Sequence, residues 1–132
     1  MINKIYLLDS NILIYAEKQE NKLLQNFIFE NQCYVSELSS LECLGYTKIT
    51  DLENTFFNNC FLVFSNIAIS GAVIGKTMQL RQYKKSSVGD AIIAATALLY
   101  HTVLLTVNVK DFEFIDGLEV ENPFDKMELT SE

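Results

Sequence analysis

The chain is 132 residues long, and 49% of its residues are hydrophobic. This length suits a single domain with a core of its own. No apolar run reaches the roughly 18–20 residues of a membrane-spanning helix, and the N-terminus shows no signal-peptide cleavage site, so we expect a soluble cytoplasmic protein without a membrane partner. Three scattered cysteines (Cys33, Cys43, Cys60) and one histidine argue against a zinc site.

The net charge of −7 argues at first against a nucleic-acid partner. However, the imbalance lies at one end, because residues 1–110 contain nine acids and nine bases, whereas residues 111–132 contain eight acids and one base. Within the neutral part, four bases fall in one ten-residue stretch: Lys76, Arg81, Lys84 and Lys85. The overall charge therefore does not exclude an anionic partner, although a solvated basic helix end explains the same stretch.

Hydrophobic periodicity predicts short strands alternating with helices. In chain order we expect a strand at 4–8, a helix at 11–16 capped by Ser10 or Asn11, a helix at 20–31, a strand at 32–36, a helix from 36 to 49 capped by Ser36, a helix at 51–59, a strand at 61–64, helices at 67–85 and 86–101, a strand at 102–107, a short helix or turn at 109–115 and an edge strand at 118–120. This order predicts a single α/β domain over 1–122, with a central, mostly parallel sheet flanked by helices, and an acidic C-terminal tail over 123–132.

In such a sheet the functional crevice lies beyond the carboxyl ends of the strands. Asp9 directly follows the first predicted strand, and Asn108 and Asp111 follow the strand at 102–107. We therefore expect these polar side chains at one edge of the sheet, although a turn residue or an exposed loop acid would fit each position singly.

Two further acids lie on predicted helices. Glu42 falls on a stripe with Leu38, Leu41 and Gly45 at helical spacing, which predicts a carboxylate facing the core, unless it lies at the edge of a tilted helix in water. Asp90 opens the most apolar helix, where an acid also simply complements the helix dipole. Neither position is decisive alone.

Together, these acids predict a metal site. Converging carboxylates repel one another unless a positive group lies among them. Oxygen ligands without His or Cys favour Mg²⁺ or Mn²⁺. A divalent cation held by carboxylates can activate water and stabilise a pentavalent phosphate, which is the chemistry of metal-dependent nucleases and phosphatases.

The segments LLDSNILIYA, SELSSLECLG, VGDAIIAATAL and LLTVNVKDF, in this order, resemble a PIN domain, most closely a VapC-type toxin of a toxin–antitoxin pair. The resemblance runs from about Ile5 to Phe112. It implies four catalytic and metal-binding acids, namely Asp9, Glu42, Asp90 and Asp111, with Asn108 as an alternative to Asp111. It also implies site-lining residues that orient the acids or the substrate: Ser10, Asn11, Thr106 and Asn108.

The resemblance further implies a Mg²⁺- or Mn²⁺-dependent endoribonuclease, a homodimer, and a cognate antitoxin that enters the active-site groove. RNA would then be bound by Lys76, Arg81, Lys84 and Lys85, with Lys110 as a further candidate. Two other functions stay open from the residues. One is a small phosphatase with Asp9 as nucleophile, although the second Asp usual in such enzymes is Asn11 here. The other is a non-catalytic binding module. His101 ends a helix, where a histidine is usually structural.

Overall fold

The structure is a computed structural model that describes residues 4–125. Its elements follow the chain in the order β1 (Tyr6–Leu8), α1 (Ser10–Glu17), the 3₁₀ turn η1 (Gln19–Asn21), α2 (Lys22–Glu30), β2 (Cys33–Ser36), α3 (Glu37–Leu44), α4 (Asp51–Val63), β3 (Ser65–Ile67), α5 (Gly71–Tyr83), α6 (Val88–Leu99), β4 (Val103–Leu105), the 3₁₀ turn η2 (Val109–Phe112) and β5 (Val120–Glu121).

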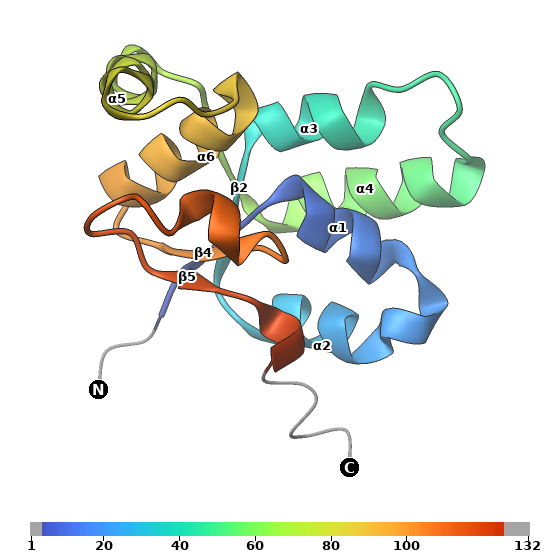
Figure 1. The fold of residues 1–132 in the computed structure, drawn as a ribbon. Helices are drawn as coiled ribbons and strands as arrows, with labels where there is room; N and C mark the ends of the chain where they lie inside the picture. Colours follow the sequence, from blue (N-terminus) through green and yellow to red (C-terminus); the bar gives the residue numbers. More distant parts are fainter. Residues whose placement is uncertain (1–3, 126–132) are drawn as a thin grey trace.

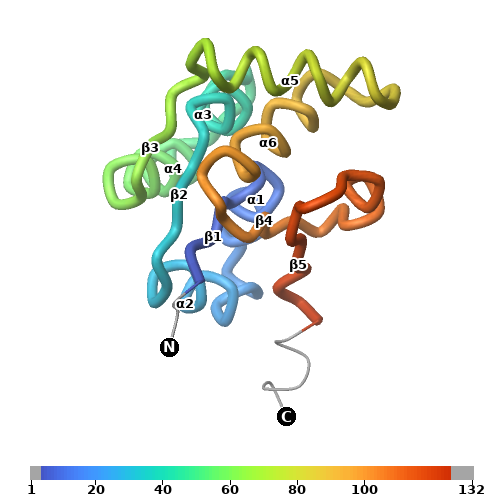
Figure 2. Tube along the Cα trace, turned by 90° about the vertical axis from the view of Figure 1, so that its left-hand side faces the viewer, coloured from blue at the N-terminus to red at the C-terminus, as the bar shows by residue number. Residues whose placement is uncertain are grey.

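The strands form one five-stranded sheet in the order β3-β2-β1-β4-β5, and every pairing is parallel. Figure 2 shows the strands following one another in this order across the molecule. β1 and β4 lie side by side, with Leu8 paired to Leu105. Because both strands end at this pair, Asp9 and Thr106 emerge next to each other at the carboxyl edge. The predicted α/β class with a parallel central sheet is confirmed.

Each face of the sheet carries its own apolar core, since successive strand residues point to opposite faces. Leu8 and Leu105 pack with residues of α1, α2, α3 and α4, including Ile12, Ile28 and Phe57. Leu7 and Leu104 pack on the other face with α6 and η2. Figure 1 shows α1, α3 and α4 on one side of the strands and α5 and α6 on the other. The sheet edge is therefore held rigidly between two helix layers.

Two local predictions are wrong. Residues 61–63, predicted as a strand, continue α4, and the strand follows at Ser65–Ile67. Phe64 is the C-cap of α4, so the apolar run spans a helix end and a loop rather than a strand. The cap of α1 is neither Ser10 nor Asn11 but Asp9, whose side chain accepts from the Ser10 backbone N–H. By contrast, Ser36 caps α3 as predicted, accepting from the Leu38 backbone N–H.

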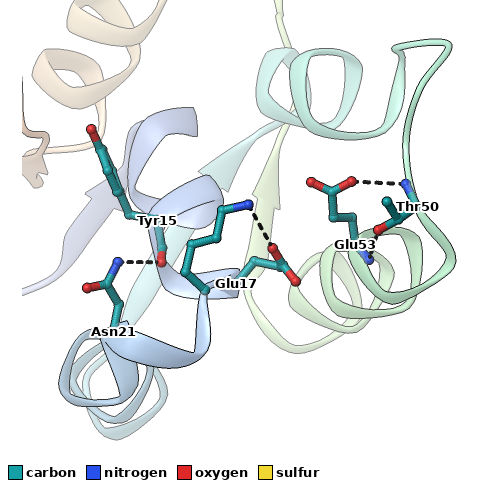
Figure 3. Close-up of polar contacts among 6 residues, drawn as sticks. Tyr15, Glu17, Asn21, Thr50 and Glu53 are labelled. Atoms are coloured by element: carbon teal, nitrogen blue, oxygen red, sulfur yellow. Dashed lines mark hydrogen bonds and ion pairs between the residues drawn. The ribbon is translucent and has the colours of Figure 1, made fainter.

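Short polar contacts fix the end of α1 and the start of α4 (Figure 3). Asn21 Nδ2 donates to the Tyr15 carbonyl at 2.9 Å, which closes the turn after α1. At the start of α4, Thr50 Oγ1 accepts from the Glu53 backbone N–H, and the Glu53 carboxylate accepts from the Thr50 N–H. This capping box satisfies two backbone donors that a helix N-terminus otherwise leaves to water.

The C-terminal end of the described chain also packs on the domain. The Phe124 ring lies edge-on to Tyr15 with 5.8 Å between centroids. Residues 126–132 of the predicted acidic tail lie outside the described residues. Between residues 4 and 125, no helix is long and apolar enough to cross a bilayer.

Candidate active site

Asp9 stands at the centre of a polar cluster at the carboxyl edge of the sheet. Only 8% of the residue is exposed, and three donors hold its carboxylate. Oδ1 accepts from the Ser10 backbone N–H at 2.9 Å, and Oδ2 accepts from Thr106 Oγ1 at 2.8 Å and Asn11 Nδ2 at 3.2 Å. Hydrogen bonds to an ionised acceptor are stronger than neutral ones, so this geometry favours the carboxylate over the carboxylic acid.

Asn11 and Thr106 form the support for that carboxylate. The Val107 backbone N–H donates to Asn11 Oδ1 at 3.3 Å, which orients the amide so that its Nδ2 faces Asp9. Thr106 is fully buried and also accepts from the Asn108 backbone N–H at 3.1 Å. The predicted polar pair, Thr106 and Asn108, therefore follows β4 and contributes in two ways. Thr106 Oγ1 donates to Asp9, and the backbone N–H of Asn108 donates to Thr106 Oγ1.

Ser10 connects Asp9 to α3. Its Oγ lies 2.6 Å from Glu42 Oε1 and 3.0 Å from the Ser39 hydroxyl. Because a hydroxyl carries one proton, Ser10 donates to the Glu42 carboxylate and accepts from Ser39. Ser39 is fully buried, so this pair fixes one oxygen of Glu42 from the protein side.

Glu42 is nevertheless placed differently from the sequence expectation. The predicted core-facing stripe is wrong, because α3 ends at Leu44 and Leu41, its supposed core neighbour, is 66% exposed. Glu42 itself is exposed, while Ser39 and Cys43 face the core. A β-carbon placed on Gly89 would lie 3.8 Å from Glu42 Oε2, so the second carboxylate oxygen faces the start of α6.

Asp90 and Asp111 complete the cluster from α6 and η2. Both line one small gap, here named the acid hollow, together with Ser86, Ala91 and Phe114, and this gap is too small to admit a water molecule. Asp90 lies in the first turn of α6, and Asp111 is exposed on η2, where its backbone N–H binds the Asn108 carbonyl at 3.0 Å. The structure therefore places Asp111 beside Asp90, while Asn108 supports Thr106.

The electrostatics of the cluster are those of crowded acids. Burial raises the pKa of Asp9, the bonds from Thr106 and the Ser10 N–H lower it, and the charges of Asp90 and Glu42 raise it again. Burial also raises the pKa of Asp90, which a bond from Ser87 lowers and the charges of Asp111 and Glu42 raise. Within residues 4–125 the ion pairs join Lys4 to Glu121 and Lys18 to Glu17, so none neutralises these acids.

The donor set fits a hard divalent cation. Every group around Asp9 that could bind a cation offers oxygen. Burial raises the pKa of the neighbouring Cys43 thiol to about 12, so it stays protonated and is a poor metal ligand. As placed, no three acid, His or Cys side chains in the described part of the chain lie close enough to hold one ion. Binding therefore requires the exposed acids, Glu42 and Asp111, to turn toward Asp9.

The predicted RNA-binding side chains form no ion pair with the site acids within residues 4–125. Lys76 and Arg81 are on α5, and Lys84 and Lys85 follow it. Arg81 Nε donates to the Ser86 carbonyl at 3.3 Å, and Lys84 Nζ lies 4.9 Å from the Phe114 ring centroid. His101 precedes β4 and is therefore at the amino edge of the sheet, away from the acids.

Two serines at the start of α6 were not predicted. Ser87 is the N-cap, and its Oγ accepts from the Asp90 N–H at 3.1 Å. The spacing S-V-G-D, a serine three residues before an acid, is the sequence signal of such a cap. The Ser86 hydroxyl is buried in the acid hollow and has no hydrogen-bond partner among the described residues. A single serine carries no pattern that could have revealed this.

The fold and the sequence can be compared with known proteins. No protein-family model and no curated protein matches the sequence. Among solved structures, a toxin–antitoxin complex from Klebsiella pneumoniae contains a chain of 30% identity, with a TM-score of 0.72 over 89% of this chain and 97% of that one. VapBC2 from Rickettsia felis, bound to a promoter DNA fragment, superposes with a TM-score of 0.76 at 22% identity, covering 89% and 98% of the two chains. The chain belongs to the VapC family of PIN-domain proteins.

FitAcB from Neisseria gonorrhoeae shares the fold at 21% identity, with a TM-score of 0.74 over 90% of this chain and 98% of that one. These matches span the sheet and both helix layers, so they confirm the PIN-like arrangement of this VapC-family chain. In that arrangement Asp9 follows β1 and the other three acids lie on α3, α6 and η2, segments distant in the sequence, whose charges act on one another near the carboxyl edge.

Proposed function

We propose that the protein is a Mg²⁺- or Mn²⁺-dependent endoribonuclease and the toxin of a type II toxin–antitoxin pair. The observation that carries this proposal is Asp9, a nearly buried carboxylate held by three donors and lying beside further acids, none of which pairs with a Lys or Arg of residues 4–125. Such a cluster is stable as carboxylates only when a cation shares it. The acid cluster lies at the carboxyl edge of a parallel sheet, which is where such folds bind their ligands.

Asp9, Glu42, Asp90 and Asp111 are the residues that would hold the ion. When bound, the cation supplies Lewis-acid stabilisation of charge on the phosphate and a lower pKa for water. Asp9 would be the fixed anchor, because Asn11 and Thr106 leave its carboxylate a single orientation. Ser10 Oγ donates to Glu42 Oε1, and the second carboxylate oxygen, Oε2, faces the start of α6.

The hydrogen bonds of Asn11 argue against an aspartyl phosphatase. A phosphatase of that kind needs a free second carboxyl near its nucleophile. Here the corresponding side chain is an amide whose Nδ2 donates to Asp9 and whose Oδ1 accepts from the Val107 N–H. A carboxylate in this position would set an acceptor against the Asp9 oxygen. Hydrolysis of a phosphodiester supported by carboxylates and a cation therefore fits better than phosphoryl transfer to Asp9.

Two partners follow from the same proposal. The solved neighbours are toxin–antitoxin complexes, which supports a cognate antitoxin for this chain. A second copy of the chain is the other partner, and an open groove of about 580 Å³ between α5 and α6 supports it. The groove exposes the apolar side chains of Ile74, Met78 and Val88. Burying them against a second copy would remove apolar surface from water.

The test is RNA cleavage by purified wild-type protein and by Asp9→Asn and Asp90→Asn, with Mg²⁺ or Mn²⁺ and with EDTA. Asp51→Asn is the matched control, because Asp51 also lies in the first turn of a helix but is exposed on α4. We expect wild type and control to cleave equally, and both site variants to lose about a hundredfold or more. Cleavage that persists in EDTA, or that both site variants retain, would contradict the proposal.

A further inference from the structure

Ser86 contributes a hydroxyl group to the acid hollow, directly before the N-cap of α6. Its Oγ is buried and has no hydrogen-bond partner among residues 4–125. The acid hollow is too small to admit a water molecule, so only the groups that line it can reach this hydroxyl. A buried hydroxyl without a partner costs stability, because it has given up its hydrogen bonds to water. Few such groups persist in folded proteins, and each calls for an explanation.

The site acids differ in whether a hydroxyl group supports them. Three of the four accept a hydrogen bond from a serine or threonine side chain, with Thr106 donating to Asp9, Ser10 to Glu42 and Ser87 to Asp90. The fourth, Asp111, has an exposed carboxylate that accepts no hydrogen bond and forms no ion pair in the described part of the chain. The acid hollow is therefore lined by an acid without a donor and, in Ser86, by a donor without an acceptor.

The backbone holds both groups beside the acid hollow. Arg81 Nε donates to the Ser86 carbonyl at 3.3 Å, and the next residue, Ser87, caps α6. On η2, the Asp111 backbone N–H donates to the Asn108 carbonyl at 3.0 Å. The hydroxyl and the carboxylate can therefore change their positions by rotation about side-chain bonds, while both chain segments stay in place.

Rotation of the Asp111 carboxylate is what a bound cation requires. As placed, the acids within residues 4–125 are too dispersed to hold one ion, and Asp111 must turn from solvent toward Asp9 and Asp90. That turn takes a carboxylate out of water and brings it closer to like charges, and both effects oppose it. A hydroxyl that donates to the carboxylate at the end of the turn offsets part of this cost, since hydrogen bonds to charged acceptors are strong.

We infer that Ser86 is the positioning residue of Asp111: its hydroxyl donates to the Asp111 carboxylate when this carboxylate turns inward to share a divalent cation with the other site acids. The inference rests on the proposed function, because it supposes that the acids hold a cation. It goes further by assigning the fourth ligand position to Asp111 rather than to Asn108. It also explains why a buried hydroxyl is kept without a partner while Asp111 faces solvent.

The test is the affinity for Mn²⁺, measured in the absence of RNA by the electron paramagnetic resonance signal of the free ion. The variants are Ser86→Ala, Asp111→Ala and the double variant that combines them. Ser40→Ala is the matched control, because the Ser40 hydroxyl donates to the Glu37 carbonyl and lies outside the acid hollow. Unfolding by urea in EDTA is measured for each protein, so that an effect on the fold is separated from an effect on ion binding.

We expect Ser86→Ala to weaken Mn²⁺ binding by about 10- to 100-fold, the usual effect of removing a group that orients a metal ligand. Asp111→Ala should weaken it at least as much, and the double variant no more than Asp111→Ala alone, because the hydroxyl has then lost its acceptor. In EDTA, Ser86→Ala should unfold at the same urea concentration as wild type or at a higher one, since the variant lacks an unpaired buried hydroxyl. Ser40→Ala should bind Mn²⁺ as wild type does.

Two outcomes would overturn the inference alone. One is wild-type Mn²⁺ affinity in Ser86→Ala, and the other is a double variant whose loss is the sum of the two single losses, since Ser86 would then act through a different acid. RNA cleavage that depends on Asp9 would uphold the proposed function in either case. A wild-type protein that binds no Mn²⁺ would overturn the inference and the proposed function together. The expected Mn²⁺ affinities without any RNA cleavage would uphold the role of Ser86 and overturn the proposed nuclease.

Discussion

The bond from Thr106 to Asp9 offers a test of the site that needs no substrate and no metal. Replacing Thr106 by valine preserves the shape of the side chain but removes the Oγ1 that donates to Asp9 Oδ2 at 2.8 Å in a fully buried position. A hydrogen bond to a charged group contributes about 1.5–3 kcal/mol, and the added methyl group returns about 0.8 kcal/mol by burial. We expect a net loss of about 1–2 kcal/mol at neutral pH. With an unfolding entropy of about 2.1 cal/mol/K per residue over 132 residues, this lowers Tm by about 4–7 °C.

The pH dependence of this loss identifies its cause. Burial raises the folded-state pKa of Asp9 above its usual value of 3.8, and the Thr106 bond counteracts that rise. Without the bond the folded-state pKa rises further, so ionising Asp9 costs the folded variant more than it costs the folded wild type. The stability difference should therefore be small below the unfolded pKa, grow as pH rises through the two folded-state pKa values, and stay constant above them.

The assay is thermal and urea unfolding in EDTA over pH 3–8, as a series of about six values. Thr96→Val is the matched control, because Thr96 is a buried threonine whose Oγ1 donates to a backbone carbonyl, that of Ile92, rather than to a carboxylate. We expect the control to change stability by the same amount at every pH. A loss in Thr106→Val that is equally independent of pH would refute the argument that Thr106 stabilises an ionised Asp9.

Two further predictions concern the site's support and the self-association of the chain. Ser10→Ala removes the donor to Glu42 Oε1, so we expect the rate of RNA cleavage to fall about 10- to 100-fold and the metal concentration at half-maximal rate to rise. Ser40→Ala is the control, because the Ser40 hydroxyl donates to the Glu37 carbonyl, and it should leave both quantities unchanged. Ile74→Lys places a charge in the α5–α6 groove, so sedimentation of this variant should show a monomer. Leu62→Lys, on the exposed face of α4, is the control and should keep the oligomeric state of the wild type. A dimer that survives Ile74→Lys would assign self-association to another surface.

Most of the fold could be predicted from local patterns. The β1 and β4 segments are short apolar runs that end in polar residues, and the VGDAIIAATAL segment is apolar around the whole helix axis. Both patterns predict that the segment is buried between other helices and strands. The strand predicted at 61–64 was wrong because its apolar residues suit a helix end as well as a strand, and periodicity cannot separate the two in so short a run.

The candidate site was predicted in part, and for reasons of unequal strength. Asp9 could be placed because a strand end fixes the position of the next residue. Glu42 was predicted as a site acid, and the structure places its carboxylate against Ser10, but the argument from a buried stripe was wrong, since α3 is short and Leu41 faces solvent. The contact of Ser39 with Ser10 could not be predicted, because a single serine has no periodicity and its partner is distant in the sequence.

The sequence by itself determined that the chain forms alternating strands and helices and that acids follow two of the strands. Hydrophobic periodicity and chain direction decide this, because they act between residues that are close in the chain. Only the tertiary structure decided which groups meet. The pairing of Leu8 with Leu105 places Thr106 against Asp9, and the packing of α3 beside α1 places Ser10 against Glu42. Both depend on the register of strands and the seating of helices, which the whole core sets and no local segment contains.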